Sequence, residues 1–334
     1  MRILVTGGAG FIGSNFIRYV FDKNMSCEIV NLDKLSYAGN LENLKDIEKN
    51  ENYTFMKGDI CDHKTVEKAI KGCDYVVNFA AESHVDRSIH GADEFIMSNV
   101  LGTNVLLEKA RMNGVSKFIQ ISTDEVYGSI ENGSFTEDSV LAPNSPYSAS
   151  KAAAEHMCRA YFVTFGLPVV ITRSSNNFGP YQYPEKFVAL SITNLIEGKK
   201  IPLYGDGKNV RDWLYVEDNC DGIYFVLNKG AAGEVYNIAG GYEMMNIDMV
   251  HDIVRAAGGD RSMIEYVKDR LGHDRRYSLD DSKLRDMGWK PNHTFKEALD
   301  KTVKWYEDHR DWWMKIKHKD TYKKYYTKQY KGKD

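Results

Sequence analysis

The residues best suited to proton transfer lie in two short segments of the sequence. Thr123, Asp124 and Glu125 are adjacent, and Tyr147 and Lys151 follow four positions apart. Two neighbouring carboxyl groups can supply one acid and one base, and a phenol beside an ammonium can accept a proton from an alcohol. Together these groups could oxidise an alcohol and eliminate water.

The acidic pair follows the apolar run Phe118–Ser122, which we interpret as a strand. Ligands of open α/β sheets bind outside the carboxyl ends of the strands, where Asp124 and Glu125 would then lie. Ionising two neighbouring carboxyl groups at a buried end of the sheet costs much free energy, so one keeps its proton while the other stays charged. The spacing alone leaves open a solvated acidic turn.

Tyr147 and Lys151 are predicted to share one face at the start of a helix. Ser145 is a good N-cap, and Pro146 suits the first helical position. A phenol with a pKa of about 10 is a poor base at neutral pH. The Lys151 ammonium, the helix N-terminus and a cationic nicotinamide would each favour the phenolate. The alternative is a tyrosine in the core beside a lysine that reaches solvent.

A glycine loop follows the first predicted strand. Gly7-Gly8-Ala9-Gly10-Phe11-Ile12-Gly13 contains GxGxxG between the strand Ile3–Thr6 and an amphipathic helix. Such glycines permit a tight turn, a close approach to a pyrophosphate and close helix–strand packing. Asp33 ends the second predicted strand, where its charge favours the ribose diol of NAD over the 2′-phosphate of NADP. Lys34 slightly weakens that preference.

Six short apolar runs alternate with segments of helical length before residue 175, which predicts a parallel sheet covered on both faces. The runs are Ile3–Thr6, Glu28–Leu32, Tyr53–Lys57, Tyr75–Phe79, Phe118–Ser122 and Val169–Thr172. We therefore expect an α/β protein with a doubly wound (Rossmann) parallel sheet and a smaller α/β C-terminal substrate lobe.

The expected NAD-binding domain covers residues 1–175, and the chain returns to it around 213–240, where Trp213–Tyr215 and Val235–Ile238 read as strands. Residues 176–212 and 241–334 would form the lobe that binds substrate. The basic and aromatic C-terminal segment Tyr322–Lys333 is interpreted as a solvated tail on the last helix.

Composition and charge narrow the class of protein. The chain has 334 residues, 43% hydrophobic and 27% charged, with a net charge of −3. This composition is globular, and no overall positive field would attract nucleic acid or an anionic membrane. No apolar run is long enough to span a membrane, and the N-terminus lacks the pattern of a signal peptide, so we expect a cytoplasmic protein. The five scattered cysteines and nine histidines show no metal-ligand spacing, so no metal is expected.

These motifs together make the sequence resemble a known family, the extended short-chain dehydrogenase/reductases, and within them the dTDP-glucose 4,6-dehydratases. The matching segments are TGGAGFIGSN, AAESHVD, STDEVYG, YSASK, NNFGPYQYPEKF, PLYGDGKNVRDWLYVEDN and GHDRRY. The Asp124-Glu125 pair is the most discriminating motif. The related 4-epimerases usually lack this pair, and UDP-glucuronate decarboxylases typically carry a single Glu there.

The resemblance implies a role for each of the five residues. Tyr147 would take the proton of the sugar C4 hydroxyl, with Thr123 bonded to that oxygen and Lys151 orienting the nicotinamide ribose. A hydride would leave C4 for NAD, Glu125 would remove the C5 proton, and Asp124 would protonate the departing C6 hydroxyl. The hydride would then return to C6, which makes the protein a hydro-lyase yielding a 4-keto-6-deoxy sugar.

The loop and the resemblance together give the expected binding residues. Those for NAD are Gly7, Gly10, Phe11, Ile12, Gly13, Asp33, Lys34, Asp59, Ile60, Ala81, Tyr147 and Lys151. Those for the nucleotide sugar are Ser83, His84, Asn177, Lys186, Pro202, Tyr204, Arg211, Asn246, Arg270 and His273. The arginines suit a diphosphate and Tyr204 suits the face of a base.

The family also dimerises through a four-helix interface. Ala153, Ala160 and Val163 on the Tyr147 helix and the apolar segment Phe95–Ala110 are compatible with it, as they are with burial inside the monomer. One departure is that Phe187–Leu190 lacks the family's usual Ile-Pro step, so the local helix start could differ.

Three alternatives to dTDP-glucose dehydration remain open. One is a nucleotide-sugar 4-epimerase on the same scaffold, and another is a dehydratase or decarboxylase of UDP sugars. A methyl group contributes only about 1–3 kcal/mol of discrimination, so the residues do not separate thymine from uracil. The third, an inactive NAD-binding sensor or scaffold, conflicts with the presence of all five proton-transfer residues.

Overall fold

The computed structural model describes residues 1–331. Seven parallel strands form the main sheet, in the order β10-β6-β5-β4-β1-β2-β3. Their bounds are β1 Arg2–Thr6, β2 Glu28–Asp33, β3 Tyr53–Lys57, β4 Tyr75–Asn78, β5 Lys117–Thr123, β6 Val169–Ser174 and β10 Val235–Ile238. The expected doubly wound α/β fold is confirmed, and all six predicted strands are present.

Helices cover both faces of this sheet because alternate strand residues point to opposite sides. Ile3 and Val5 belong to the apolar core on the side of α1 and α8, whereas Leu4 packs with α2 and α5 on the other. The helices of these two layers are α1 Phe11–Lys23, α8 Val216–Lys229, α2 His63–Ile70, α5 Thr103–Met112 and α6 Pro146–Phe165.

The strand order reverses between β1 and β4. Chain connections leave in opposite directions there, which opens a crevice at the carboxyl ends of the strands. The short helices after β4 and β5 lie near this crevice: α3 Val85–His90, α4 Asp93–Phe95, the π-helix η2 Ile96–Gly102 and the 3-10 helix η3 Asp124–Tyr127.

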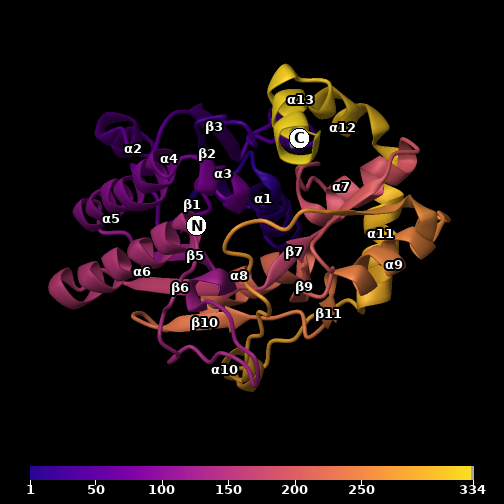
Figure 1. Ribbon diagram of the computed structural model, residues 1–334. Helices are drawn as coiled ribbons and strands as arrows, with labels where there is room; N and C mark the ends of the chain where they lie inside the picture. Colours follow the sequence, from indigo (N-terminus) through magenta and orange to yellow (C-terminus); the bar gives the residue numbers. More distant parts are fainter. Residues whose placement is uncertain (332–334) are drawn as a thin grey trace.

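The remaining elements form two small sheets with helices beside the main sheet (Figure 1). The sheets are β11-β9-β7, with bounds Glu243–Met245, Val210–Tyr215 and Asn176–Phe178, and β12-β8, with bounds Ile264–Val267 and Ile201–Tyr204. The accompanying helices are α7 Phe187–Ile196, α9 Asn246–Ala256, α10 Ser282–Asp286, α11 Phe295–Asp308, α12 Arg310–Lys317 and α13 Asp320–Tyr326. Three further short helices lie within residues 1–331: η1 Leu41–Leu44, η4 Arg261–Met263 and η5 Thr327–Lys331.

The chain returns to the main sheet once, through β10, which pairs with β6. The other candidate for that return, Trp213–Tyr215, lies instead in β9, which pairs with β7 and β11. The division into an NAD-binding and a substrate-binding part stays a prediction. Within residues 1–331 no helix is long and apolar enough to span a membrane.

Candidate functional site

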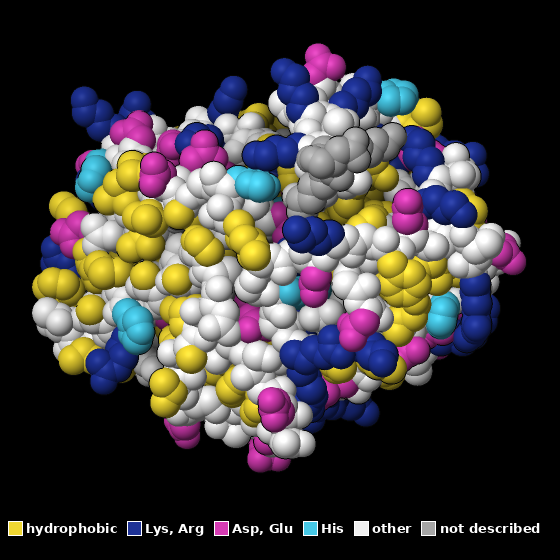
Figure 2. Space-filling model, in the orientation of Figure 1, with side chains coloured by type: hydrophobic (Ala, Val, Ile, Leu, Met, Phe, Trp, Pro, Cys, Tyr) yellow, Lys and Arg dark blue, Asp and Glu magenta, His cyan; other side chains and the backbone are white. Residues whose placement is uncertain are grey.

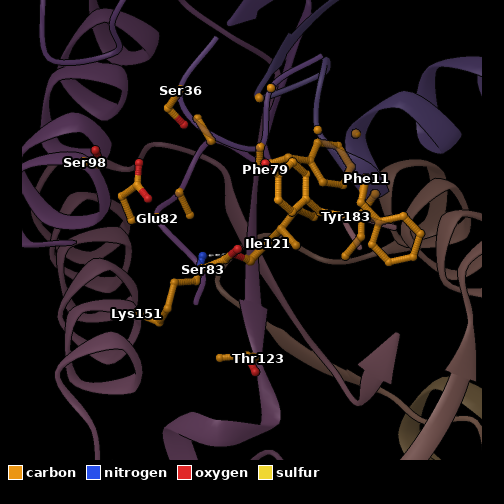
Figure 3. Close-up of a pocket in the computed structure, with 18 of the residues that line it drawn as sticks. Phe11, Ser36, Phe79, Glu82, Ser83, Ser98, Ile121, Thr123, Lys151 and Tyr183 are labelled. Carbon is orange, nitrogen blue, oxygen red and sulfur yellow. Dashed lines mark hydrogen bonds between the residues drawn. The ribbon is translucent and has the colours of Figure 1, made fainter. Parts of the chain in front are cut away.

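A cavity at the carboxyl ends of β1, β4 and β5 brings together residues that are far apart in the sequence (Figure 3). All twelve residues expected to bind NAD line its wall, as do Thr123, Asp124 and Glu125. Of the ten expected substrate residues, Ser83, Asn177 and Lys186 line it. The reversal of strand order therefore places the predicted NAD-binding residues and the predicted proton-transfer residues in one cavity.

The glycine loop at one end of the cavity has a shape that only glycine permits. Gly7 has a φ of +70°, and a Cβ atom there would lie 2.6 Å from the backbone nitrogen of Ala80. A Cβ on Gly13 would lie 2.5 Å from the carbonyl oxygen of Gly7. The loop therefore brings backbone close to the cavity at the start of α1, where unpaired N–H groups favour an anion.

Asp33, at the end of β2, is fixed by two backbone amides. Its carboxylate accepts hydrogen bonds from Ala9 N at 2.9 Å and Leu35 N at 2.7 Å. Burial raises the pKa of Asp33, and these two bonds oppose the rise. A carboxylate has about four acceptor positions, so it can still bind a ribose diol. The adjacent Lys34 is paired with Asp59 at 2.8 Å.

The acidic pair forms the first turn of η3, directly after β5. Thr123 caps this turn, with its Oγ1 accepting from Glu125 N at 3.3 Å and donating to Asp124 Oδ1 at 3.1 Å. Only 2% of Asp124 is exposed, and its Oδ2 has no hydrogen-bond partner among the described residues. The pair is therefore at a buried cavity wall and is not a solvated turn.

The two carboxyl groups differ in their surroundings. Burial, followed by the charge of Glu125, raises the pKa of Asp124 to about 8. Burial also raises the pKa of Glu125, but three cations oppose the rise: Arg270, Arg211 and Lys186. The raised pKa favours the protonated form of Asp124 near neutral pH. Arg211 opposes the rise at both carboxyl groups, but Arg270 and Lys186 are among the opposing charges only at Glu125.

Tyr147 and Lys151 are held by the start of α6. Ser145 and Ser148 form a reciprocal capping box, and Pro146 occupies the first helical position, as expected. The Lys151 ammonium donates to the carbonyl oxygen of Ile121 on β5 (Figure 3). This bond ties the helix to the strand that carries Thr123.

The expected lowering of the Tyr147 pKa is not found in this chain. Burial raises its pKa, followed by the charges of Glu125 and Asp124, and the Thr123 side chain opposes the rise. Burial lowers the pKa of Lys151 to about 8, with Glu155 opposing. The ammonium, the helix end and a cationic nicotinamide were the groups expected to lower this pKa, and the charges of Glu125 and Asp124, which raise it, were not foreseen.

Two of the expected substrate residues that line the cavity are hydrogen-bonded to each other, because Lys186 Nζ donates to Ser83 O at 2.8 Å. Seven of the expected substrate residues lie outside the cavity wall: His84, Pro202, Tyr204, Arg211, Asn246, Arg270 and His273. Several gather around the buried Asp86, which accepts from Tyr204 Oη at 3.1 Å and is paired with Arg270 at 3.3 Å.

Arg211, His273 and His84 are also held by neighbours. Arg211 stacks 4.1 Å above the Tyr277 ring and donates to Asp274 O. His273 Nδ1 lies 2.6 Å from an Asp269 carboxylate oxygen, and burial lowers the pKa of His273 to about 4. Burial likewise lowers the pKa of His84. These imidazoles are therefore neutral near pH 7.

Pro202 and Asn246 have no contact with the cavity among the described residues. Pro202 pairs with Glu265 in the β12-β8 sheet, and Asn246 begins α9, where its N–H donates to Asn209 O at 2.9 Å. Their roles toward a substrate stay predictions from the resemblance.

Sequence reasoning missed several residues of the cavity wall: Ser36, Tyr37, Glu82, Ser98, Ser122, Ser175, Gln182 and Tyr183. Glu82, Ser122, Gln182 and Tyr183 stand inside quoted motifs, which was the available signal. Tyr37 is in a loop with no motif of its own.

The C-terminal segment also differs from the expected solvated tail. Tyr322 is buried and donates to Pro184 O, and Gln329 Nε2 donates to Tyr204 Oη at 2.6 Å. The segment lies against the expected substrate residues because its tyrosines supply apolar rings with polar ends. Residues 332 and 333, the end of that expected tail, lie outside the described residues.

Comparison with known proteins agrees with this geometry. The family model described as GDP-mannose 4,6 dehydratase matches residues 4–302. A dTDP-glucose 4,6-dehydratase of Streptomyces niveus is 49% identical over 325 residues, covering 96% of this chain and 97% of the relative. The chain belongs to the nucleotide-sugar 4,6-dehydratase family. The resemblance inferred from the motifs is therefore confirmed.

Solved structures separate the 4,6-dehydratases from their neighbours. The dTDP-glucose 4,6-dehydratase DesIV from Streptomyces venezuelae, with NAD and dTDP bound, has a TM-score of 0.92 and 49% identity, covering 95% of this chain and 100% of that one. A UDP-glucose 4-epimerase from Thermus thermophilus, in complex with NAD, has a TM-score of 0.86 and 31% identity, covering 92% of this chain and 100% of the other. Epimerases are thus the more distant neighbours.

Proposed function

We propose that this 4,6-dehydratase converts dTDP-glucose into dTDP-4-keto-6-deoxyglucose, with NAD as a cofactor that is regenerated in each cycle. The observation that carries the proposal is the acidic pair of the buried Asp124 and the half-buried Glu125, which lines the cavity of the glycine loop together with Tyr147. Oxidation alone needs one base, whereas elimination of water also needs an acid.

The residues of the cavity fit the dinucleotide. The glycine loop lines the cavity at the start of α1, where unpaired N–H groups favour a pyrophosphate, and Asp33 keeps acceptor capacity for a ribose. Because Lys34 is paired with Asp59, its charge is not free to favour a 2′-phosphate. When bound, NAD stores the hydride between the two redox steps.

Tyr147 accepts the proton of the sugar C4 hydroxyl in this proposal. Thr123 donates a hydrogen bond to the same oxygen, and Lys151 orients the nicotinamide ribose from one turn further along α6. The contact of the phenol with Thr123 supports this role, because it opposes the rise of the Tyr147 pKa that burial and the two carboxyl groups cause. Loss of the C4 proton and hydride makes a ketone, which acidifies the C5–H bond.

Glu125 removes the C5 proton, and Asp124 donates its proton to the departing C6 hydroxyl. These opposite roles are supported by the surroundings of the two groups: the pKa of Asp124 is raised to about 8, whereas the charges of Arg270, Arg211 and Lys186 stabilise the Glu125 carboxylate. The C5 and C6 carbons are then joined by a double bond. The returning hydride adds at C6, and Glu125 gives the proton that it removed back to C5, which completes the reduction.

The proposal is tested by supplying the purified protein with dTDP-glucose and, separately, with UDP-glucose. We expect the alkali-induced absorbance of a 4-keto product from dTDP-glucose, and much less from UDP-glucose. Formation of UDP-galactose without a 4-keto product would identify an epimerase. No turnover of either sugar by protein that binds NAD would point to a sensor or scaffold.

The protein also forms a homodimer in this proposal. Hydrophobic side chains gather on the face of α5 and α6 (Figure 2). Ile96, Met97 and Leu101 of η2 are 40% or more exposed, as are Val163 and Phe165 of α6. A patch of this kind on two adjacent helices is typical of a helical interface between copies.

A further inference from the structure

Arg87 on α3 joins a loop of the cofactor cavity to the C-terminal segment. Its guanidinium lies 4.0 Å from the centre of the Tyr37 ring and 4.6 Å from that of Tyr325. Its Nη2 is paired with the buried Glu185 at 2.8 Å. Arg87 is thus held between two aromatic rings by one fixed carboxylate.

The loop in question, residues 34–40, forms part of the cavity wall. Tyr37 and Ala38 line the cavity and also pack on a small apolar core made by Tyr183, Ile316 and Tyr322. That core comes from α12, α13 and the segment before α7. The C-terminal helices, which Figure 1 shows in yellow beside α1 and α3, therefore support this loop from outside.

The same segment has a second attachment next to Arg87. Tyr325 Oη and Gln329 Nε2 each lie 3.4 Å from Asp86 Oδ2, and Tyr325 Oη lies 3.3 Å from His84 Nε2. These contacts anchor α13 and η5 to the residues on both sides of the α3 N-terminus.

We propose that Arg87 and the segment Asp320–Gln329 form a clasp that holds loop 34–40 over the bound dinucleotide and slows its release. The proposal rests on NAD being the cofactor of the proposed reaction. A hydride taken from C4 must be returned to the same sugar, so release of the cofactor between the two redox steps would end the cycle. Arg87 is a positioning residue, since it acts through Tyr37.

The test compares Arg87→Met and Tyr325→Ala with the unaltered protein. Arg111→Met is the matched control, because Arg111 also stacks on a ring, Phe165 at 5.1 Å, and pairs with a carboxylate, Glu108 at 2.8 Å, away from the cavity wall. Two quantities are measured: the NAD dissociation rate by dilution into excess unlabelled NAD, and amide hydrogen exchange in residues 34–40 without cofactor.

We expect NAD to dissociate at least tenfold faster from Arg87→Met and Tyr325→Ala, with faster exchange in residues 34–40 and no change in Arg111→Met. Unchanged NAD dissociation in both clasp variants would overturn the proposal, whether or not exchange rises. If the unaltered protein binds no NAD, the proposed function is wrong. In that case, amide exchange in residues 34–40 that is the same in both clasp variants as in the unaltered protein would refute the clasp independently.

Discussion

At the scale of single residues, the proposed chemistry depends on two adjacent carboxyl groups with different environments. Asp124 is almost wholly buried, and the charge of Glu125 adds to the rise of its pKa. Glu125 faces Arg270, Arg211 and Lys186, whose charges oppose its protonation. One sequence position therefore separates an acid from a base.

Glu125→Gln should separate the oxidation from the elimination. The amide is similar in shape to the carboxyl group but cannot remove the C5 proton, so we expect dehydration to fall roughly 100- to 10,000-fold. Oxidation at C4 should continue, and reduced cofactor should accumulate after dTDP-glucose is added. The measurement is stopped-flow absorbance of NADH, and full dehydration by this variant would contradict the role of Glu125.

The pH dependence of elimination should follow Asp124. Its pKa of about 8 lies above the ordinary value, so the acid is present below pH 8 and is lost as the pH rises through it. We expect the decay of the transient NADH signal to slow about tenfold per pH unit above pH 8.

Asp124→Asn is the control for this profile. Its small residual decay should show no such alkaline decrease, because the titrating carboxyl group is gone. A decrease near pH 8 that persists in Asp124→Asn would assign the titration to another group, with Lys151, whose pKa is also about 8, as the first candidate.

At the scale of elements, α6 positions the phenol and the ammonium through its first turn. Ser145 Oγ accepts from Ser148 N at 3.1 Å, and Ser148 Oγ accepts from Ser145 N at 3.1 Å. Helix α11 begins with the same kind of capping box, formed by Thr294 and Glu297. The two helix starts form a matched pair, because α6 carries Tyr147 and Lys151 of the cavity wall, whereas α11 has no residue in that wall.

Ser145→Ala and Thr294→Ala should each lower the free energy of unfolding by about 1 kcal/mol, measured by urea denaturation. Only Ser145→Ala should also lower kcat, several-fold, because a frayed first turn displaces Tyr147. Equal kcat values in the two variants would show that the cap of α6 does not position the catalytic side chains.

The sequence predicts the elements of the main sheet well because its strands, apart from the edge strand β3, are mostly buried. Each is a short, continuous apolar run, and β2 ends at Asp33 as the spacing from Gly13 indicated. The helix start at Ser145-Pro146 was also predictable from the sequence, since a capping residue acts within one turn of the helix. Strand β9 was not assigned to its sheet, because its partners β7 and β11 carry weak patterns of only three residues each.

The sequence predicts the catalytic motifs of the site well, but it does not predict the contact around Arg87. The glycine loop, the acidic pair and the Tyr147 turn are contiguous in sequence, so their spacing carries information. Tyr37, Arg87 and Tyr325 come from distant segments, and their contact depends on how α12 and α13 pack against the loop 34–40. No local pattern specifies such a contact.

At the scale of the whole molecule, the apolar face of η2 and α6 is the surface that a second copy would cover. Met97→Glu places a charge in this face, so we expect the dimer to dissociate into monomers, measured by size-exclusion chromatography with light scattering. Met25→Glu is the control, since Met25 is 67% exposed and lies outside the patch. A Met97→Glu protein that remains dimeric would refute this interface.

The whole molecule must also complete a redox cycle without net consumption of its cofactor. The central claim is that one hydride leaves C4 and returns to C6 of the same sugar, within one cavity that holds both the glycine loop and the acidic pair.

The most direct test uses dTDP-glucose with deuterium at C4, mixed with an equal amount of unlabelled substrate that carries a heavy-carbon label in the ring. Mass spectrometry and NMR of the product locate the deuterium. We predict deuterium at C6 of the molecules that held it at C4, and none in the molecules with heavy carbon. Deuterium lost to solvent, kept at C4 or transferred between molecules would contradict the account.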